Sequence, residues 1–191
     1  LVDRGFHAIR MDNRDSGLSS ATIESNEYTL DDMADDVLAV LNDVEVADAI
    51  VFGVSLGGMV AQAFAIKYPT RTRALVSAMS ATGEPGIGLG SAEVVEVLLL
   101  PDEATAQAQL EADLRARRLW SNPDWFDEEL LRTYFIACSD RSRVAGGGQR
   151  QFAAVSRSED RVEALRALDV PALVIHGGSD TLITPEAGRR T

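Results

Sequence analysis

Four short apolar runs along the chain alternate with segments in which apolar residues recur every three or four positions. The runs are FHAIRM (6–11), AIVFG (49–53), RALVSAM (73–79) and VPALVIHG (170–177). Apolar runs without polar alternation are typical of buried strands in a parallel sheet. Because helical patterns separate them, the chain is expected to form an α/β fold with a mostly parallel sheet and flanking helices.

Three helices are expected next to these strands. In the first, apolar residues recur at helical spacing: Leu30, Met33, Val37, Leu38 and Leu41. Thr29 and Asp32 form the pattern of a capping box at its start, with Asp in the usual Glu position. Residues 58–68 predict an alanine-rich helix that Pro69 ends, and residues 160–168 predict a helix that leads into the last strand.

Residues 83–159 interrupt this alternation. After GEPGIGLG, which predicts a flexible connection, four segments have helical character: SAEVVEVLLL, DEATAQAQLEADLRARRLW, DWFDEELLRTYFIAC and GGGQRQFAAVSR. We therefore expect an α/β core from residues 1–82 and 160–191, with residues 83–159 inserted as a helical cap. The glycines at 86–90 lack the spacing of a dinucleotide-binding loop. Those at 146–148 lack the Lys-Ser/Thr pair of a phosphate-binding loop and are interpreted as a hinge of the cap.

Composition narrows the possible partners and location. The chain has 46% hydrophobic and 25% charged residues, as globular domains do. Its 30 acidic residues outnumber 18 basic ones and are spread along the chain, so we expect neither nucleic acid nor an anionic membrane as partner. No apolar stretch reaches the roughly 18 residues of a membrane span, and the expected location is cytoplasmic. The single Cys138 excludes an internal disulfide and is expected to be buried as a small apolar residue.

A cluster of carboxylates raises the alternative of a metal site. Asp31, Asp32, Asp35 and Asp36 lie on one predicted helix. Early carboxylates favour a helix N-terminus, and we expect the later ones to be solvated. Neither a metal nor a cofactor is therefore expected.

The stretch VFGVSLGGM (51–59) is the strongest candidate for chemistry. Gly53 and Gly57 flank Ser55 in a Gly-x-Ser-x-Gly pattern, with an apolar strand before it and a helix after it. This context predicts a nucleophilic serine held at a strained turn. The N–H of Leu56, at the start of the helix, is the expected oxyanion donor. The alternative is a tight strand–helix turn with an uninvolved serine.

Such a serine needs an acid and a histidine that follow it along the chain in that order. Asp180, in HGGSDTLITP just past the last strand, is the predicted acid that orients the histidine; alternatively it caps a helix near Pro185 or braces the turn. The two histidines are His7, expected as a structural residue of the first strand, and His176. Neither follows Asp180, so the catalytic histidine is expected outside this sequence. His176 as base, or as metal ligand with Asp180, is the weaker alternative because other ligands are missing.

Together these stretches resemble the α/β-hydrolase superfamily, serine esterase type, over the whole chain. They are, in order, HAIRMDNRDSGLS, DDMADDVLAVLNDVEVADAIVFGVSLGGMVAQAFAIKYP, the helical cap and ALDVPALVIHGGSDTLITP. The loop at 12–19, with Asp15 where many members have glycine, resembles aclacinomycin methylesterase-like hydrolases in particular. Its Asp and Ser side chains are expected to form turn hydrogen bonds rather than to act in catalysis.

The resemblance implies a longer sheet, of which this chain would supply the fourth to seventh strands. The chain opens as LVDRGFHAIR, without an initiator methionine. We therefore expect a fragment that lacks the first strands, the loop with the second oxyanion donor and the C-terminal histidine segment. Expressed alone, residues 1–191 are expected to be inactive and poorly soluble.

The resulting prediction is a serine hydrolase that cleaves a small-molecule carboxylic ester or related carbonyl compound by a Ser–His–Asp acyl-enzyme mechanism, as a monomer or homodimer. Six cap aromatics either roof an apolar pocket or pack cap helices together: Trp120, Trp125, Phe126, Tyr134, Phe135 and Phe152. Alternatives on the same scaffold are a cofactor-free haloperoxidase or perhydrolase and a hydrolase of C–C bonds or lactones. From a different class, the chain is a catalytically inactive relative that binds a ligand or a protein.

Overall fold

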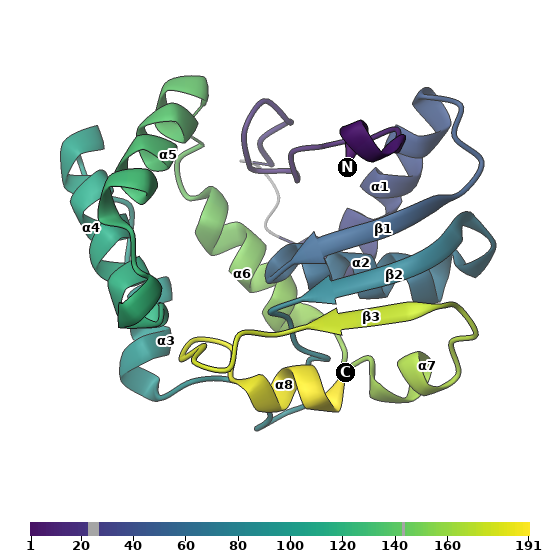
Figure 1. Ribbon diagram of the computed structural model, residues 1–191. Coiled ribbons are helices and arrows are strands. Elements are labelled where there is room, and N and C mark those ends of the chain that lie inside the picture. Colours follow the sequence, from purple (N-terminus) through teal and green to yellow (C-terminus); the bar gives the residue numbers. More distant parts are fainter. Residues whose placement is uncertain (23–26, 143) are drawn as a thin grey trace.

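A computed structural model describes residues 1–22, 27–142 and 144–191, and within them three parallel strands form one sheet. The strands are β1 (Ala49–Val54), β2 (Thr72–Ala78) and β3 (Ala172–Ile175), in the order β1-β2-β3 (Figure 1). Val51 of β1 pairs with Leu75 of β2, which in turn pairs with Ala172 of β3. The predicted α/β class and its parallel sheet are confirmed.

Two helices build the buried layer beside the sheet. Helix α2 (Leu56–Lys67) packs against β1 and β2, and α1 (Leu30–Asp43) packs against α2. Because α2 lies between the sheet and α1, it is buried on nearly every side, and Phe64 is completely enclosed. The capping box at Thr29 and Asp32 is present, and α2 ends before Pro69 as predicted. The 3-10 turn η2 (Pro69–Arg71) then leads into β2.

The remaining core elements are short. Helix α7 (Val162–Arg166) precedes β3, which confirms the predicted helix there, and α8 (Pro185–Arg190) follows it. A 3-10 turn, η1 (Val2–Arg4), lies near the start of the chain. None of the helices in the described ranges has the length and apolar character that crossing a membrane requires.

Between residues 83 and 159 the described chain forms helices and no strand. These helices are α3 (Ala92–Leu98), α4 (Ala106–Trp120), α5 (Glu128–Arg141) and α6 (Gly147–Arg157), with the 3-10 turn η3 (Pro123–Trp125). Figure 1 shows α3, α4 and α5 standing away from the sheet, whereas α6 runs back toward it. The predicted helical character of this segment is confirmed, and its boundaries as a separate cap remain a prediction.

The prediction of a strand at residues 6–11 was wrong. This segment has no regular secondary structure, and Phe6 is 51% exposed. A strand needs a neighbour for its backbone groups, and β1 pairs with β2 but with no segment of 6–11 within the described residues. His7 lies in the same exposed segment, so its expected structural role in a strand was also wrong.

Two further expectations about single residues are corrected. Cys138 is exposed rather than buried, because α5 packs on α4 through a partly covered face and buries no residue completely. Asp35 and Asp36 are not merely solvated: Asp35 pairs with Lys67 at 2.6 Å and Asp36 with Arg14 at 2.6 Å. No group of residues suited to hold a metal ion occurs within the described ranges.

The glycine-rich connection is anchored rather than flexible. Leu89 forms an antiparallel bridge with Ile183, and Gly88 accepts a hydrogen bond from Thr184 N–H at 2.8 Å. A Cβ at Gly90 would lie 1.9 Å from the Thr181 carbonyl oxygen. Gly90 is therefore required for close backbone approach to the segment that follows β3.

Candidate active site

Ser55 lies at the turn between β1 and α2, and its backbone is strained. Its φ of 55° and ψ of −121° fall in a region that residues with a Cβ rarely adopt. Ser55 N–H donates to the Ala78 carbonyl at 2.8 Å, which fixes the turn to the end of β2. The predicted sharp bend is therefore observed.

Close packing explains two of the three glycines around Ser55. A Cβ on Gly53 would lie 1.9 Å from the Gly57 carbonyl oxygen, and one on Gly58 would lie 2.6 Å from Ser80 Cβ. Gly57 itself has open space where a Cβ would be. Its backbone is the obstacle that requires glycine at position 53.

The first turn of α2 directs N–H groups toward the same end of the sheet as Ser55. Gly58 and Met59 donate to the Ser55 carbonyl at 2.9 and 3.2 Å. Leu56 and Gly57 precede them in the first turn, where an α-helix supplies no acceptor for its own N–H groups. Their N–H groups and the positive end of the helix can stabilise negative charge beside Ser55.

Ser55 opens into a cleft of about 490 Å³ that also contains Asp180. Its walls come from the ends of β1 and β2, from the last turn of α4 and η3, and from the loop after β3. Two strained non-glycine residues of the described chain, Ser55 and Met79 (φ 46°), line it. Backbone strain of this kind is often concentrated at functional sites.

The cleft settles part of the question about the cap aromatics. Trp120 and Trp125 line it, as expected for a roof over a pocket. Tyr134 and Phe135 instead pack on each other with ring centroids 5.7 Å apart. Sequence reasoning missed Arg117 and Met79 as cleft residues, because nothing in the apolar periodicity marks which side of α4 or which strand end faces the serine.

Asp180 braces the loop after β3 while lining the cleft. Its Oδ1 accepts hydrogen bonds from Leu182 N–H and Ile183 N–H, both at 3.0 Å. Its Oδ2 lies 3.7 Å from His176 Nε2. The turn-bracing alternative is thus observed, and the second carboxylate oxygen takes no part in it.

His176 is placed as a structural residue. Its side chain is 8% exposed, and Nε2 donates to the Ile183 carbonyl at 2.8 Å. Nδ1 is buried without a partner in the described chain, and a Cβ on Gly188 would lie only 2.5 Å from it. Because one nitrogen is used and the other is covered by α8, His176 is poorly placed to take a proton from Ser55.

A comparison with known proteins identifies the architecture that surrounds this serine. The whole chain, residues 1–191, matches the alpha/beta hydrolase fold family. The chain belongs to this family. The parallel sheet agrees with that membership, and so does the strained serine between a strand and the helix that follows it.

Relatives of this α/β hydrolase include several named enzymes. It is 26% identical over 187 residues to 3-oxoadipate enol-lactonase 2 of Acinetobacter baylyi, covering 96% of this chain and 65% of that protein. It is 42% identical over 72 residues to rhodomycin D methylesterase DnrP of Streptomyces peucetius, covering 37% of this chain and 24% of that protein. The chain thus spans about two thirds of the length of the lactonase.

Solved structures resemble this α/β hydrolase over nearly its whole length. A hydrolase from Pseudomonas aeruginosa PA01 is 29% identical with a TM-score of 0.68, covering 95% of this chain and 65% of that chain. The enol-lactonase from Burkholderia xenovorans LB400 is 25% identical with a TM-score of 0.68, covering 94% of this chain and 65% of that chain.

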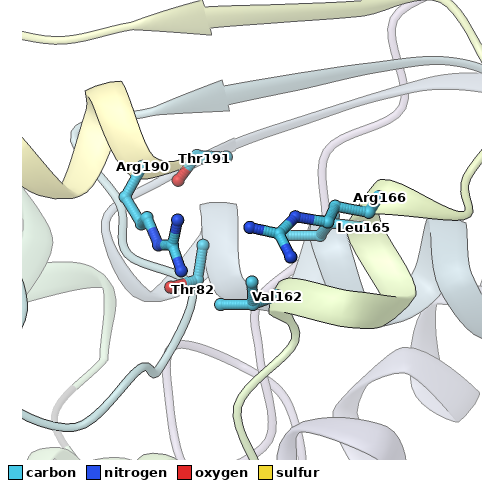
Figure 2. Close-up of a pocket in the computed structure, with 6 residues that line it drawn as sticks. All are labelled: Thr82, Val162, Leu165, Arg166, Arg190 and Thr191. Carbon is cyan, nitrogen blue, oxygen red and sulfur yellow. The ribbon is translucent and has the colours of Figure 1, made fainter.

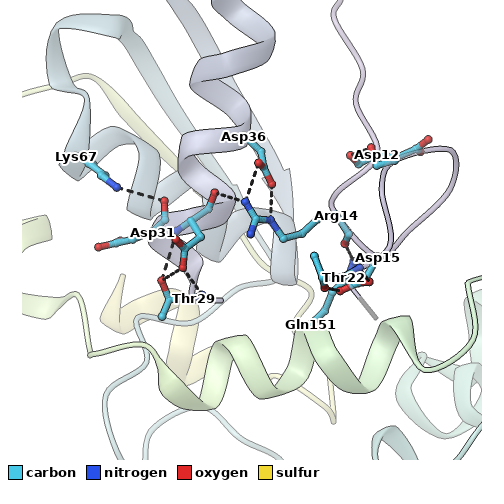
Figure 3. Close-up of polar contacts among 11 residues, drawn as sticks. Asp12, Arg14, Asp15, Thr22, Thr29, Asp31, Asp36, Lys67 and Gln151 are labelled. Carbon is cyan, nitrogen blue, oxygen red and sulfur yellow. Dashed lines mark hydrogen bonds and ion pairs between the residues drawn. The ribbon is translucent and has the colours of Figure 1, made fainter. Parts of the chain in front are cut away.

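The loop at residues 12–22 of the α/β hydrolase connects α1 with α5 and α6. Arg14 binds Asp36 of α1 at 2.6 and 2.8 Å, and Gln151 of α6 donates to the Arg14 carbonyl at 2.8 Å (Figure 3). Asp12 accepts from Leu18 N–H at 2.9 Å, so the predicted turn hydrogen bonds are confirmed. Arg141 of α5 also pairs with Asp12 at 2.6 Å.

Asp15 is the buried centre of this loop. It adopts a φ of 63°, which explains why glycine suits this position and why Asp, which tolerates left-handed backbone, replaces it. Burial raises the pKa of its carboxyl, but hydrogen bonds from Arg150 and from the hydroxyl and N–H of Thr22 outweigh it, so the pKa lies well below its usual value. A Cβ on Gly147 would lie 2.1 Å from the Asp15 carbonyl oxygen, so glycine at the first position of α6 allows close approach to this loop.

The substitution Asp15→Asn is expected to lower the free energy of unfolding by about 1–3 kcal/mol at pH 7, because it removes the charge that Arg150 contacts but keeps the backbone tolerance. A depressed native pKa stabilises the fold above the unfolded pKa of about 3.9, and that contribution is lost as the pH falls further. The difference in the free energy of unfolding between the wild type and Asp15→Asn should therefore shrink below about pH 4. Urea titrations of the intact protein between pH 7 and pH 3 measure it. A difference that stays constant with pH would contradict this assignment, and exposed Asp124→Asn serves as control.

A second, smaller hollow is a poor candidate for a site. It has about 90 Å³ and lies between α7 and α8, with Arg166 and Arg190 directed toward it (Figure 2). Both arginines already have carboxylate partners, since Arg166 pairs with Glu163 and Arg190 with Glu84. The two charges are therefore compensated within the chain.

Proposed function

We propose that the intact protein hydrolyses a carboxylic ester with Ser55 as the nucleophile. The observation that carries this proposal is the strained Ser55 backbone at the wall of a 490 Å³ cleft. The turn alone does not require serine, because glycine would adopt a φ of 55° at this position without strain. Retaining a hydroxyl there supports a chemical role rather than a purely structural one.

In the proposed mechanism, the Ser55 hydroxyl attacks the ester carbonyl and gives its proton to a histidine. The Leu56 N–H, at the start of α2, stabilises the negative charge that develops on the carbonyl oxygen. The alcohol then leaves as it accepts the proton from the histidine, and water cleaves the acyl-enzyme by the same steps. Oδ2 of Asp180 takes no part in bracing the loop and lies 3.7 Å from His176 Nε2, which supports a role for Asp180 as the acid that orients a histidine.

The histidine is proposed to come from outside residues 1–191. His7 lies in an exposed segment without regular structure, and His176 uses Nε2 to hold the Ile183 carbonyl. Neither is among the residues that line the cleft with Ser55.

A lactone is a cyclic ester and needs the same acyl chemistry, so the enol-lactonase and methylesterase relatives both support this reaction class. The division into a core (1–82 and 160–191) and a cap (83–159) is proposed with it, since the cleft lies between these parts.

Labelling with a fluorophosphonate tests the proposal. The intact protein is expected to gain one phosphonyl group, located at Ser55 by peptide mass spectrometry, because only an activated serine reacts rapidly with this reagent. Heat-denatured protein should remain unlabelled and serves as the control. If the folded protein resists the reagent and turns over neither esters nor lactones, the inactive binding-protein alternative is favoured instead.

A further inference from the structure

The wall of the Ser55 cleft contains one arginine with no role in the proposed reaction. Arg117 lies in the last turn of α4, and its guanidinium carbon is 6.0 Å from the ring centroid of Trp120 and 5.9 Å from that of Phe135. Asp180 is the other charged residue that lines the cleft in the described chain. Aromatic rings hold the guanidinium in place without neutralising it.

Several carboxylates on α4 and α5 are bound by other groups. Glu128 pairs with Arg118 and Arg132, and Glu111 pairs with Arg132 at 2.7 Å. Asp180 Oδ1 accepts two backbone hydrogen bonds. Within the described part of the chain, Arg117 contacts aromatic rings and has no ion pair, although the sequence has 30 acidic residues and only 18 basic ones.

We propose that Arg117 binds a carboxylate on the substrate, so that the enzyme prefers esters or lactones that carry a second, free acid group. A guanidinium suits a carboxylate because its planar fork donates two parallel hydrogen bonds. Trp120 and Trp125 supply apolar wall for the carbon chain between the two ends, and a cleft of about 490 Å³ is within the usual range for small ligands. This inference rests on the proposed function, because it assigns a substrate class to the cleft of Ser55.

Matched substrates isolate the effect of the charge. The probes are monoethyl esters of unbranched dicarboxylic acids with four to eight carbons, roughly the reach of such a pocket. Each is compared with the matched ester in which a primary amide replaces the free acid group. At the best chain length, the intact wild-type enzyme is expected to favour the acid by about ten- to a hundredfold in kcat/KM, mainly through KM. Arg117→Gln should remove this preference and leave kcat/KM for the amide within about twofold. Arg118→Gln is the matched control, because Arg118 is the next residue but pairs with Glu128 outside the cleft lining.

A binding measurement makes the test independent of catalysis. Both tryptophans of this sequence line the cleft, so their fluorescence reports its occupancy. The half-ester is expected to change the fluorescence of Ser55→Ala protein, and Arg117→Gln should raise its Kd about tenfold or more without changing the Kd of the amide.

The outcomes separate the two proposals. Equal binding and turnover of acid and amide by the wild type, or an equal loss for both in Arg117→Gln, would overturn the role of Arg117. Failure of the proposed function would appear differently, as no turnover of any ester and no phosphonate on Ser55. In that case, loss of half-ester binding in Arg117→Gln alone would still support the anion site, and its retention would refute it.

Discussion

Replacing Ser55 by alanine is expected to lower kcat for ester hydrolysis by about four to six orders of magnitude in the intact protein. The substitution removes the atom that forms the acyl-enzyme, while the turn and the N–H of Leu56 remain. Steady-state kinetics on the best ester found would measure the loss. Ser121→Ala is a matched control, since Ser121 lines the same cleft at the end of α4, and its kcat should stay within about threefold of the wild type.

The same position also allows a stability measurement. Ser55→Gly should inactivate the enzyme as completely as alanine does, yet raise the free energy of unfolding by about 1 kcal/mol, because glycine adopts a φ of 55° without the strain of a Cβ. Residual kcat above about a hundredth of the wild-type value in both variants would refute Ser55 as nucleophile. A Ser55→Gly protein less stable than Ser55→Ala would contradict the strain argument.

The largest expected effect on stability is at Arg161, which is buried beneath α2. Its side chain donates to Gln62 Oε1 at 3.1 Å and to the Ala81 carbonyl at 2.9 Å, and the residue is 7% exposed. Gln62 is completely buried and in turn donates to Ser77 at 3.0 Å. Burial lowers the pKa of Arg161 to about 10, against the opposing effect of Asp31 and Asp160, so the guanidinium stays charged at neutral pH.

Arg161→Ala is expected to lower the free energy of unfolding by about 3 kcal/mol, and Tm by roughly 6–12 °C. The reason is that two buried acceptors, on Gln62 and Ala81, lose their donor and a cavity remains. Calorimetry or urea titration of the intact protein measures the loss. The matched control is Arg166→Ala at the last residue of α7, whose side chain is 59% exposed and which should change stability by less than about 0.5 kcal/mol.

Arg161→Met tests the cause of this effect. Methionine keeps much of the buried volume but donates no hydrogen bond, so it should fall between wild type and alanine. An Arg161→Ala protein as stable as the wild type would mean that the cost of burying the guanidinium equals or exceeds the benefit of its hydrogen bonds. Because this network joins α2, β2 and α7, its loss should also loosen the turn that holds Ser55.

Much of the core could be predicted from local pattern. The apolar runs at β1, β2 and β3 and the helical spacing in α1 gave the correct elements, because a buried strand or an amphipathic helix leaves a mark within a few residues. The bend at Ser55 is also a local feature, because position 53 must be glycine to avoid the backbone of Gly57, only four residues away. The failure at 6–11 shows the limit, because an apolar run becomes a strand only beside a partner.

The candidate site was predictable in part. Ser55 and Asp180 were chosen from the strand ends they follow, and carboxyl ends of parallel strands meet at one edge of a sheet, which places both in one cleft. Arg117 was not found, because three arginines lie at the end of α4 and the sequence does not say which of them faces the cleft. For six aromatics the sequence left open whether they roof a pocket or pack together, and only the fold separates Trp120 and Trp125, which line the cleft, from Tyr134 and Phe135, which pack on each other.

By itself, the sequence determined the parallel α/β class, the helical character of residues 83–159 and the strained serine between β1 and α2, because these depend on periodicity and on contacts between near neighbours. Only the tertiary structure decided which charges pair and which remain unpaired: Asp15 with Arg150, Glu128 with Arg118, and Arg117 with rings alone among the described residues. The physical reason is that pairing energy depends on distance and burial, and residues separated by more than a hundred positions, such as Asp15 and Arg150, meet only when the chain has folded.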